Sequence, residues 1–192
     1  MPPPEQTSIA TVGHSTHPIE EFVGILQAHG IQQLVDVRTM PRSRRVPQFN
    51  KENLAASLQA AGILYQHMPG LGGLRHPKRD STNTGWRNAS FRGYADYMRT
   101  PEFRENLGKL IELAAQLPTA IMCAEAVPWR CHRSLIADAL MARNICVTEI
   151  LSGKPSRPHV LTPFAQVSGT EVTYPAALAD EGKNLKLEFD GL

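Results

Sequence analysis

With 192 residues, 42% of them apolar, the chain is long enough to form one domain with a full hydrophobic core. Its net charge is only +2, and its three cysteines argue against a disulfide framework and fit a reducing cytoplasm. The sequence contains neither an apolar run of about 18 residues nor a secretory-signal pattern, so we expect a cytoplasmic protein that makes no membrane contact.

Apolar periodicity predicts strands and helices in alternation along most of the chain. In chain order, the predicted elements are a strand at 9–12, a helix at 18–30, a strand at 34–37, a helix at 50–62, a strand at 63–68, helices at 94–98 and 101–117, a strand at 119–123, a helix at 131–143 and a strand at 146–151. Residues 1–8 are expected to form a flexible N-terminus, residues 9–165 a single α/β domain, and residues 166–192 a C-terminal extension.

Polar residues mark the ends of several of these elements. Thr16 or His17 is expected to cap the first helix, and Asn50 the second. A polar loop at 74–93, which holds four arginines, is typical of a lid, a binding loop or a disordered segment. Beyond residue 152 the signals are weak, apart from an edge-strand pattern at 185–189.

The alternation predicts a mainly parallel five-stranded sheet with helices on both faces, a three-layer arrangement like the Rossmann or flavodoxin folds. A barrel closed by strands from the C-terminal region is the alternative. In open sheets of this kind, ligands bind beyond the carboxyl ends of the strands. Four polar segments follow strand ends and are expected to meet at one rim: 13–16, 36–45, 71–73 and 123–133.

Positive charge is concentrated in one part of the chain. Residues 38–104 carry twelve Lys or Arg side chains and four acids, and fourteen of the chain's twenty cations are Arg. Arginine suits two-pronged contacts with phosphate or carboxylate, so this segment indicates either an anionic ligand or a solvated basic face. Four aromatic side chains in or near it offer a stacking surface or belong to the core: Phe49, Tyr65, Trp86 and Tyr94.

Two acids follow strand ends. Asp36 and Arg38 alternate along a strand and point to the same face, so they either hold a substrate, with the carboxylate as base, or form a structural salt bridge. Glu125 lies two residues beyond a buried strand, where we expect poor solvation to suit it for proton transfer. Its alternative roles are capping or an ion pair with Arg130 or Arg133.

A thiol, an imidazole and a guanidinium open the helix predicted at 131–143. Cys131, at a helix N-terminus near Arg133, is either a nucleophile with a lowered pKa or a small buried hydrophobe. His132 is an acid or base, or it binds a backbone carbonyl. Arg133 adds its charge to the helix dipole and is expected to bind an anion. His14, Cys123, Cys131 and His132 match no short zinc pattern, so we expect no metal.

Several of these residues together resemble the domain of unknown function 488 family. The resemblance rests on Gly13-His14-Ser15, Asp36-Val37-Arg38 with Pro41, Ser43 and Arg44, Leu71-Gly72-Gly73, residues 91–98, Cys123-Ala124-Glu125, Cys131-His132-Arg133, and His159 with Leu161 and Ala165. It spans residues 9–165 in order. It implies a compact α/β protein with these groups in one cleft, and it implies no particular reaction.

The leading hypothesis is an enzyme that hydrolyses or transfers a group on a phosphate-bearing substrate, a nucleotide or a nucleic acid. The candidate catalytic residues are Asp36, Glu125, His14, His132 and Cys131. The candidate binding residues are Arg38, Arg42, Ser43, Arg44, Gly72, Gly73, Tyr94 and Arg133. The alternatives are a non-catalytic module that binds nucleic acid or a protein partner, and a sulfur-transfer or redox protein that uses Cys123 and Cys131. No dinucleotide-binding glycine motif occurs, so no nicotinamide or flavin cofactor is expected.

Overall fold

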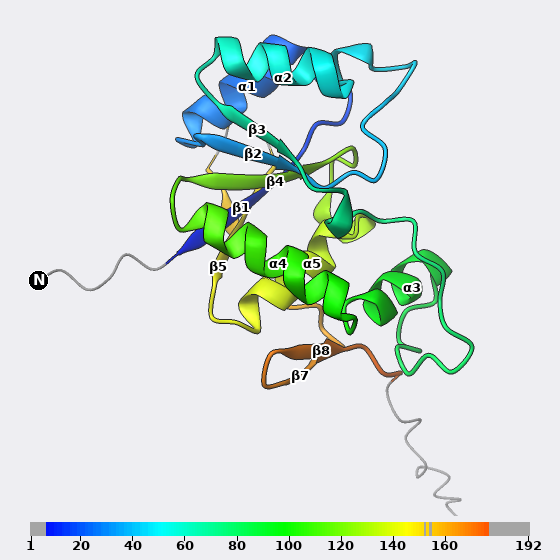
Figure 1. Cartoon of the computed structure of the whole chain (residues 1–192). Coiled ribbons are helices and arrows are strands. Elements are labelled where there is room, and N and C mark those ends of the chain that lie inside the picture. The colour runs from blue at the N-terminus through cyan, green and yellow to red at the C-terminus, as the bar shows by residue number, and fades with distance from the viewer. Residues whose placement is uncertain (1–6, 152, 154, 177–192) are drawn as a thin grey trace, which may run out of the picture.

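A computed structural model of the chain describes residues 7–151, 153 and 155–176. Its centre is an open six-stranded sheet with the order β3-β2-β4-β1-β5-β6, in which only β6 runs antiparallel to its neighbour (Figure 1). The strands are β1 (Ser8–Gly13), β2 (Gln33–Asp36), β3 (Leu64–His67), β4 (Thr119–Cys123), β5 (Cys146–Ile150) and β6 (Arg157–Pro158).

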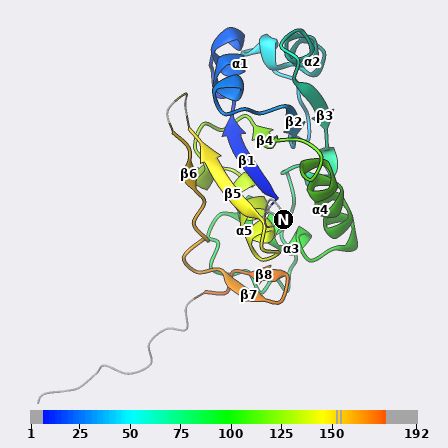
Figure 2. The same ribbon diagram turned by 90° about the vertical axis from the view of Figure 1, so that its left-hand side faces the viewer.

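Helices cover both faces of this sheet (Figures 1 and 2). On one face lie α1 (Ile19–Ala28) and α2 (Lys51–Ala60), and on the other lie α3 (Ala89–Tyr97), α4 (Pro101–Ala114) and α5 (Arg133–Met141). Each face has its own buried apolar cluster because alternate strand residues point to opposite faces. In the part of the chain that the structure describes, no helix has both the length and the hydrophobicity needed to cross a membrane.

The three-layer α/β architecture and its mainly parallel sheet are confirmed. The alternative of a barrel does not hold for the described residues, because their sheet does not close. Two details of the prediction were wrong. The sheet has six strands rather than five, because the antiparallel β6 pairs with the edge of β5. Its strand order also differs from those of the Rossmann and flavodoxin folds.

Several element boundaries differ from the prediction for local reasons. Pro18, rather than Thr16 or His17, is the N-cap of α1. Helix α3 begins at Ala89, five residues earlier than predicted, because the side chain of Asn88 accepts hydrogen bonds from two backbone N–H groups in its first turn. The strand predicted at 185–189 lies outside the described residues.

The chain beyond β5 contributes more structure than its sequence signals indicated. Strands β7 (Gln166–Ser168) and β8 (Glu171–Thr173) form a hairpin below the main sheet (Figure 1). The Tyr174 hydroxyl donates to the fully buried Asp138 of α5 at 2.8 Å, and the backbone N–H of Tyr174 donates to Asn83 at 2.9 Å. Residues 166–174 therefore pack on the α/β domain.

The chain changes sides of the sheet between β1 and β4. These strands are neighbours, but β1 leads into a helix on one face and β4 into a helix on the other. Open α/β sheets bind ligands near such a switch point. Gly13 allows the two strand ends to come close together, because a Cβ at this position would overlap the backbone carbonyl of Glu125.

Candidate active site

A pocket of about 280 Å³ opens at the carboxyl ends of β2 and β4 and the start of α5. Its lining includes six residues that the sequence singled out: Arg38, Gly73, Cys123, Glu125, Cys131 and His132. The other residues that line it are Thr39, Met40, Leu74 and Ala124. Segments far apart in the sequence thus deliver a thiol pair, an imidazole and a guanidinium to one place.

Cys131 is a buried thiol surrounded by groups that favour its ionised form. The His132 Nδ1 atom lies 3.6 Å from the Cys131 Sγ, and the backbone N–H of Arg133 donates to this sulfur at 3.5 Å. Burial raises the pKa of Cys131. The hydrogen bonds from Cys123 and His132 and the positive charges of His132 and Arg133 outweigh burial and hold this pKa well below its ordinary value. Cys131 is therefore poised as a thiolate.

The hydrogen bond at Nε2 of His132 determines whether Nδ1, the nitrogen next to Cys131, carries a hydrogen. The Nε2 atom lies 3.2 Å from the backbone carbonyl of Val37, which accepts only if Nε2 carries a hydrogen. In the neutral ring, Nδ1 is then free of hydrogen and can take the proton of the Cys131 thiol. Val37 thus orients the imidazole as a base toward the sulfur, in the arrangement that activates thiol nucleophiles.

Cys123 is the second thiol of the pocket and behaves differently. Burial and the hydrogen bond with Cys131 raise its pKa well above the ordinary value, and the neighbouring charge of Arg133 only reduces this effect. The Nε of Arg133 donates to the Cys123 Sγ at 3.0 Å. Cys123 is therefore a protonated thiol beside an ionised one. If Cys123 loses its proton, the guanidinium of Arg133 stabilises the resulting thiolate.

Arg133 does not have the position expected for an anion ligand. Its side chain is 1% exposed, and its Nη2 donates to the backbone carbonyl of Glu125 at 2.6 Å. Glu125 was expected to be poorly solvated but is exposed, because β4 ends at Cys123 and the chain then turns outward. Arg133 therefore holds the 123–125 segment against α5 and places its charge beside the two thiols.

A second polar cluster lies beside the pocket and is closed on itself. Arg38 donates to Asp36 through Nε at 2.8 Å and Nη2 at 2.6 Å, and to the backbone carbonyl of Phe49. The hydroxyl of Tyr65 donates to the same carboxylate at 2.8 Å. Burial, the charge of Asp36 and this hydrogen bond raise the pKa of Tyr65. Of the two sequence interpretations, the structure has the salt bridge.

His14 belongs to this closed cluster. Its Nδ1 lies 2.8 Å from the carbonyl of Ser15 and its Nε2 lies 3.1 Å from Nη1 of Arg38, so the ring donates at one nitrogen and accepts at the other. It also stacks on Phe49 at 4.1 Å between centroids. Burial lowers the pKa of His14 to about 4. His14 is therefore a neutral imidazole with both nitrogens in use.

The remaining predicted binding residues lie apart from the pocket. Arg42 and Arg44 are exposed, and Arg42 lines a different cavity beside α2. The Ser43 hydroxyl accepts from the backbone of its own loop. Tyr94 is 1% exposed and donates to the carbonyl of Leu71, next to Gly72, so it supports the 71–73 turn from below.

Sequence reasoning missed two apolar side chains at the pocket. Met40 and Leu74 are 72% and 75% exposed and lie in polar loops, where a single apolar residue carries no periodic signal. Leu74 has a positive φ of 58°, an uncommon backbone conformation for a branched side chain. The strained backbone of Leu74 marks it as part of the pocket wall in the structure. This angle cannot be predicted from the sequence, so no signal in the sequence pointed to Leu74.

Metal binding would need several ligands to converge. Among residues 7–151, 153 and 155–176, no three His, Cys, Asp or Glu side chains are grouped as a metal ion would require. The four residues considered for zinc divide between the two clusters, with His14 bound to Arg38 and the other three around the thiol pair.

Comparison with known proteins gives one match. A family model described as a domain of unknown function (DUF488) matches residues 18–140, which is more than half of the chain. No curated protein and no solved structure matches the chain. The matched range includes β2 to β4, both thiols and most of α5.

Proposed function

We propose that this chain, which belongs to the domain of unknown function 488 family, is a thiol-dependent oxidoreductase whose nucleophile is Cys131. The observation that carries the proposal is the hydrogen-bonded thiol pair, in which one pKa is lowered and the other raised. Two thiols with oppositely shifted pKa values in a ligand-sized pocket are suited to donate two electrons to a substrate through two successive thiol–disulfide exchanges.

The first step is attack on a small disulfide, R–S–S–R′. The Cys131 proton lies on Nδ1 of His132, and the Cys131 thiolate attacks one sulfur of the substrate. A bond forms between Cys131 and R–S, the substrate S–S bond breaks, and R′–S⁻ leaves with the proton from His132. The products are the free thiol R′–SH and a mixed disulfide between Cys131 and R–S.

The second step uses Cys123. Its thiol loses a proton to solvent and attacks the Cys131 sulfur, so a Cys123–Cys131 bond forms and R–S⁻ leaves. Arg133 stabilises the developing Cys123 thiolate from 3.0 Å. The substrate disulfide has then been reduced to two thiols, and the protein dithiol has been oxidised to a disulfide. A small external dithiol restores the protein by two exchanges of the same kind.

Three serine variants test this order of events. With bis(2-hydroxyethyl) disulfide as substrate and dithiothreitol as reductant, we expect Cys131→Ser to reduce thiol release to the uncatalysed rate. With the disulfide alone and no dithiothreitol, Cys123→Ser should stop at a mixed disulfide, visible as added mass on Cys131. Cys146→Ser is the matched control, because this exposed cysteine lies outside the pocket, and it should keep full activity. Equal turnover in Cys131→Ser and the wild type would refute the proposal.

Binding of a phosphate-bearing ligand is a second candidate, at a different place. Arg42, Lys51 and His67 line a polar cavity of about 500 Å³ at the start of α2, where backbone N–H groups also point outward. We expect inorganic phosphate to bind there and Arg42→Ala to weaken this binding. Unchanged affinity in that variant would exclude the site.

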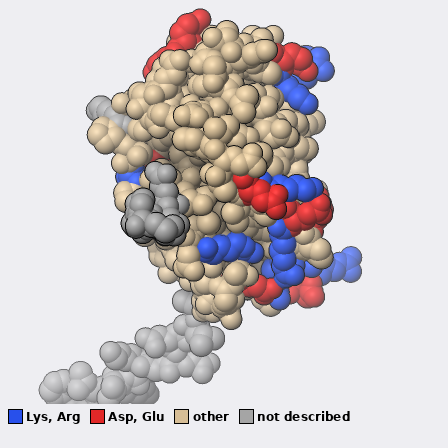
Figure 3. Space-filling view, turned by 60° about the vertical axis from the view of Figure 1, so that its left-hand side comes forward, with Lys and Arg blue, Asp and Glu red and all other residues tan. Residues whose placement is uncertain are grey.

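A nucleic-acid-binding role finds less support on the visible surface. On the face shown in Figure 3, described Lys and Arg side chains lie beside Asp and Glu side chains. On α4, for example, Lys109 pairs with Glu105, and Arg104 pairs with Glu171 of β8. We expect this module role, if present, to use the arginines of residues 74–93 and to weaken steeply with salt.

A further inference from the structure

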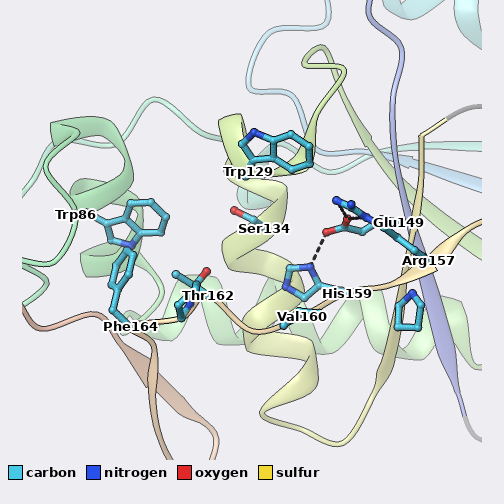
Figure 4. A pocket seen from close by; sticks show the side chains of 11 residues that line it. Trp86, Trp129, Ser134, Glu149, Arg157, His159, Val160, Thr162 and Phe164 are labelled. Carbon is cyan, nitrogen blue, oxygen red and sulfur yellow. Dashed lines mark hydrogen bonds and ion pairs between the residues drawn. The ribbon is translucent and has the colours of Figure 1, made fainter. Parts of the chain in front are cut away.

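A second cavity lies beside α5, with Ser134 of this helix in its lining. It has a volume of about 460 Å³, within the range of small-molecule sites, and shares no lining residue with the thiol pocket. Figure 4 shows Trp86 and Phe164 on one side, Glu149, Arg157 and His159 on the other, and Trp129 with Ser134 between them. Both tryptophans of the chain line this cavity.

One wall is a rigid aromatic surface. Trp86 stacks on Phe91 with 4.7 Å between ring centroids and contacts the edge of Phe164 at 4.9 Å. Its indole N–H is buried and has no hydrogen-bond partner among the described residues. This N–H carries almost no accessible surface, so Trp86 offers the cavity its ring and not its donor.

The opposite ring is free to cover a ligand. Trp129 is 57% exposed, and the guanidinium of Arg157 lies 5.4 Å above its ring. A large exposed indole that faces a cavity gains much more from stacking on a flat ligand than from water. The cavity is therefore shaped for a planar ring, with a cation at its mouth.

The hydroxyl groups of the cavity can only accept. Ser134 donates its one hydroxyl hydrogen to the backbone carbonyl of Cys131 at 3.0 Å, and Thr162 donates its own to Asp138 at 2.7 Å. Each oxygen keeps lone pairs for a ligand but has no hydrogen left to give. A ligand that satisfies them must carry N–H or O–H donors, and an amino group on a flat ring supplies two such hydrogens.

The ionised groups of the cavity are already paired. His159 lies between Glu149 at 2.8 Å and Asp138 at 2.9 Å, with both ring nitrogens in use. Arg157 pairs with Glu149 at 2.7 Å. These pairs balance one another, so the cavity offers no uncompensated charge that would select a strongly ionic ring.

We propose that this cavity binds a planar nitrogen heterocycle that bears an amino group, the chemical class of adenine. The amino group would donate to the Ser134 and Thr162 oxygens. Trp129 would stack on the ring at the mouth, and the ring of Trp86 would line the cavity beside it. This site is separate from the thiol chemistry proposed above, since the two pockets share no lining residue.

Adenosine and purine riboside, which lacks only the amino group, test the proposal on the full chain. Because both tryptophans line the cavity, intrinsic fluorescence reports occupancy directly, and calorimetry measures affinity in variants that lose an indole. We expect adenosine to bind saturably and purine riboside to bind about fivefold more weakly. Adenosine 5′-monophosphate and a short deoxyadenosine oligonucleotide then distinguish a free nucleotide from a strand end by which binds tighter.

Variants separate this site from the thiol pocket. Trp129→Ala, an exposed position, should weaken adenosine binding about tenfold. Ser134→Ala should reduce the preference for adenosine over purine riboside. Met40→Ala, the matched exposed truncation in the thiol pocket, and Cys131→Ser should bind adenosine like the wild type, whereas Trp129→Ala should keep disulfide reduction. Undiminished adenosine binding by Trp129→Ala, equal affinity for the two nucleosides, or no saturable response in the wild type would overturn the proposal.

Discussion

Two polar clusters lie side by side at the carboxyl edge of the sheet. They differ in whether their hydrogen bonds leave a group available to react. In the cluster of Asp36, Arg38, His14 and Tyr65, the carboxylate, the guanidinium and both imidazole nitrogens have partners within the fold. In the cluster of Cys123, Cys131 and His132, one proton can move between a sulfur and a ring nitrogen next to a pocket.

The comparison shows that buried charge at a strand end is not by itself a sign of chemistry. A closed cluster contributes stability and fixes the backbone, whereas an open one keeps a group available to a substrate. We therefore expect changes in the closed cluster to act on folding and changes in the open cluster to act on reactivity. Four substitutions test this division.

Asp36→Asn should have the largest effect. It removes the charge that pairs with Arg38 and leaves a guanidinium buried without its counter-ion, at a cost of about 3–5 kcal/mol in the free energy of unfolding. Chemical denaturation at pH 7 measures this change. Glu105→Gln, which breaks an exposed pair on α4, is the control and should leave stability nearly unchanged. A small effect of Asp36→Asn would show that the cluster is not closed.

His14 should make folding sensitive to acid. The folded protein keeps this ring neutral down to a pKa of about 4, whereas the unfolded chain protonates it near pH 6.5. The unfolded state then binds more protons, so stability falls by about 3 kcal/mol as the pH drops through this range.

His159 acts in the opposite direction, so a variant is needed to isolate His14. Despite burial, the pKa of His159 is raised by its hydrogen bonds with Asp138 and Glu149, and its contribution is lost as the pH rises. We expect His14→Gln to have a weaker loss of stability below pH 6.5 than the wild type, as measured by denaturation at several pH values. Identical pH profiles would contradict the assignment.

His132→Ala should act on the thiol instead of the fold. Without the imidazole, the pKa of Cys131 should rise, and the thiolate fraction at pH 6 should fall about tenfold. The rate of iodoacetamide labelling of Cys131 measures this fraction. Cys146 labelling in the same sample is the internal control. A labelling rate equal to that of the wild type would remove His132 from the activation of Cys131.

Tyr65→Phe should have the smallest effect. It removes one of the donors to Asp36 while Arg38 remains, so we expect a loss of about 1 kcal/mol in the free energy of unfolding and unchanged labelling of Cys131. Denaturation and labelling of the same preparation check both statements. A change in labelling without a change in stability would mean that the two clusters are coupled.

The sequence was sufficient for the layers of the fold but not for the full sheet. Strands β1, β2, β4 and β5 are mostly buried, and β3 alternates between exposed and half-buried residues. Periodicity detects both patterns. Strand β6 has only two residues, and the seating of Tyr174 depends on Asn83 and Asp138, which are distant in sequence. Contacts of that range leave no local pattern.

The candidate site divides in the same way. Cys131 and His132 could be predicted because a strand end and a helix start place them at a rim. The burial of Arg133 and the exposure of Glu125 could not be predicted from the sequence. They depend on where β4 ends and on which carbonyl accepts from the guanidinium. Residue type alone does not say whether an arginine binds a ligand or its own backbone.

The most direct test of the account is the pH dependence of iodoacetamide labelling at Cys131 in the Cys146→Ser background, followed by mass spectrometry of the labelled site. We predict a rate that reaches its plateau well below pH 8.5, the ordinary thiol pKa, with Cys123 unlabelled at that pH. A rate that rises only above pH 8.5, or labelling of Cys123 ahead of Cys131, would contradict it.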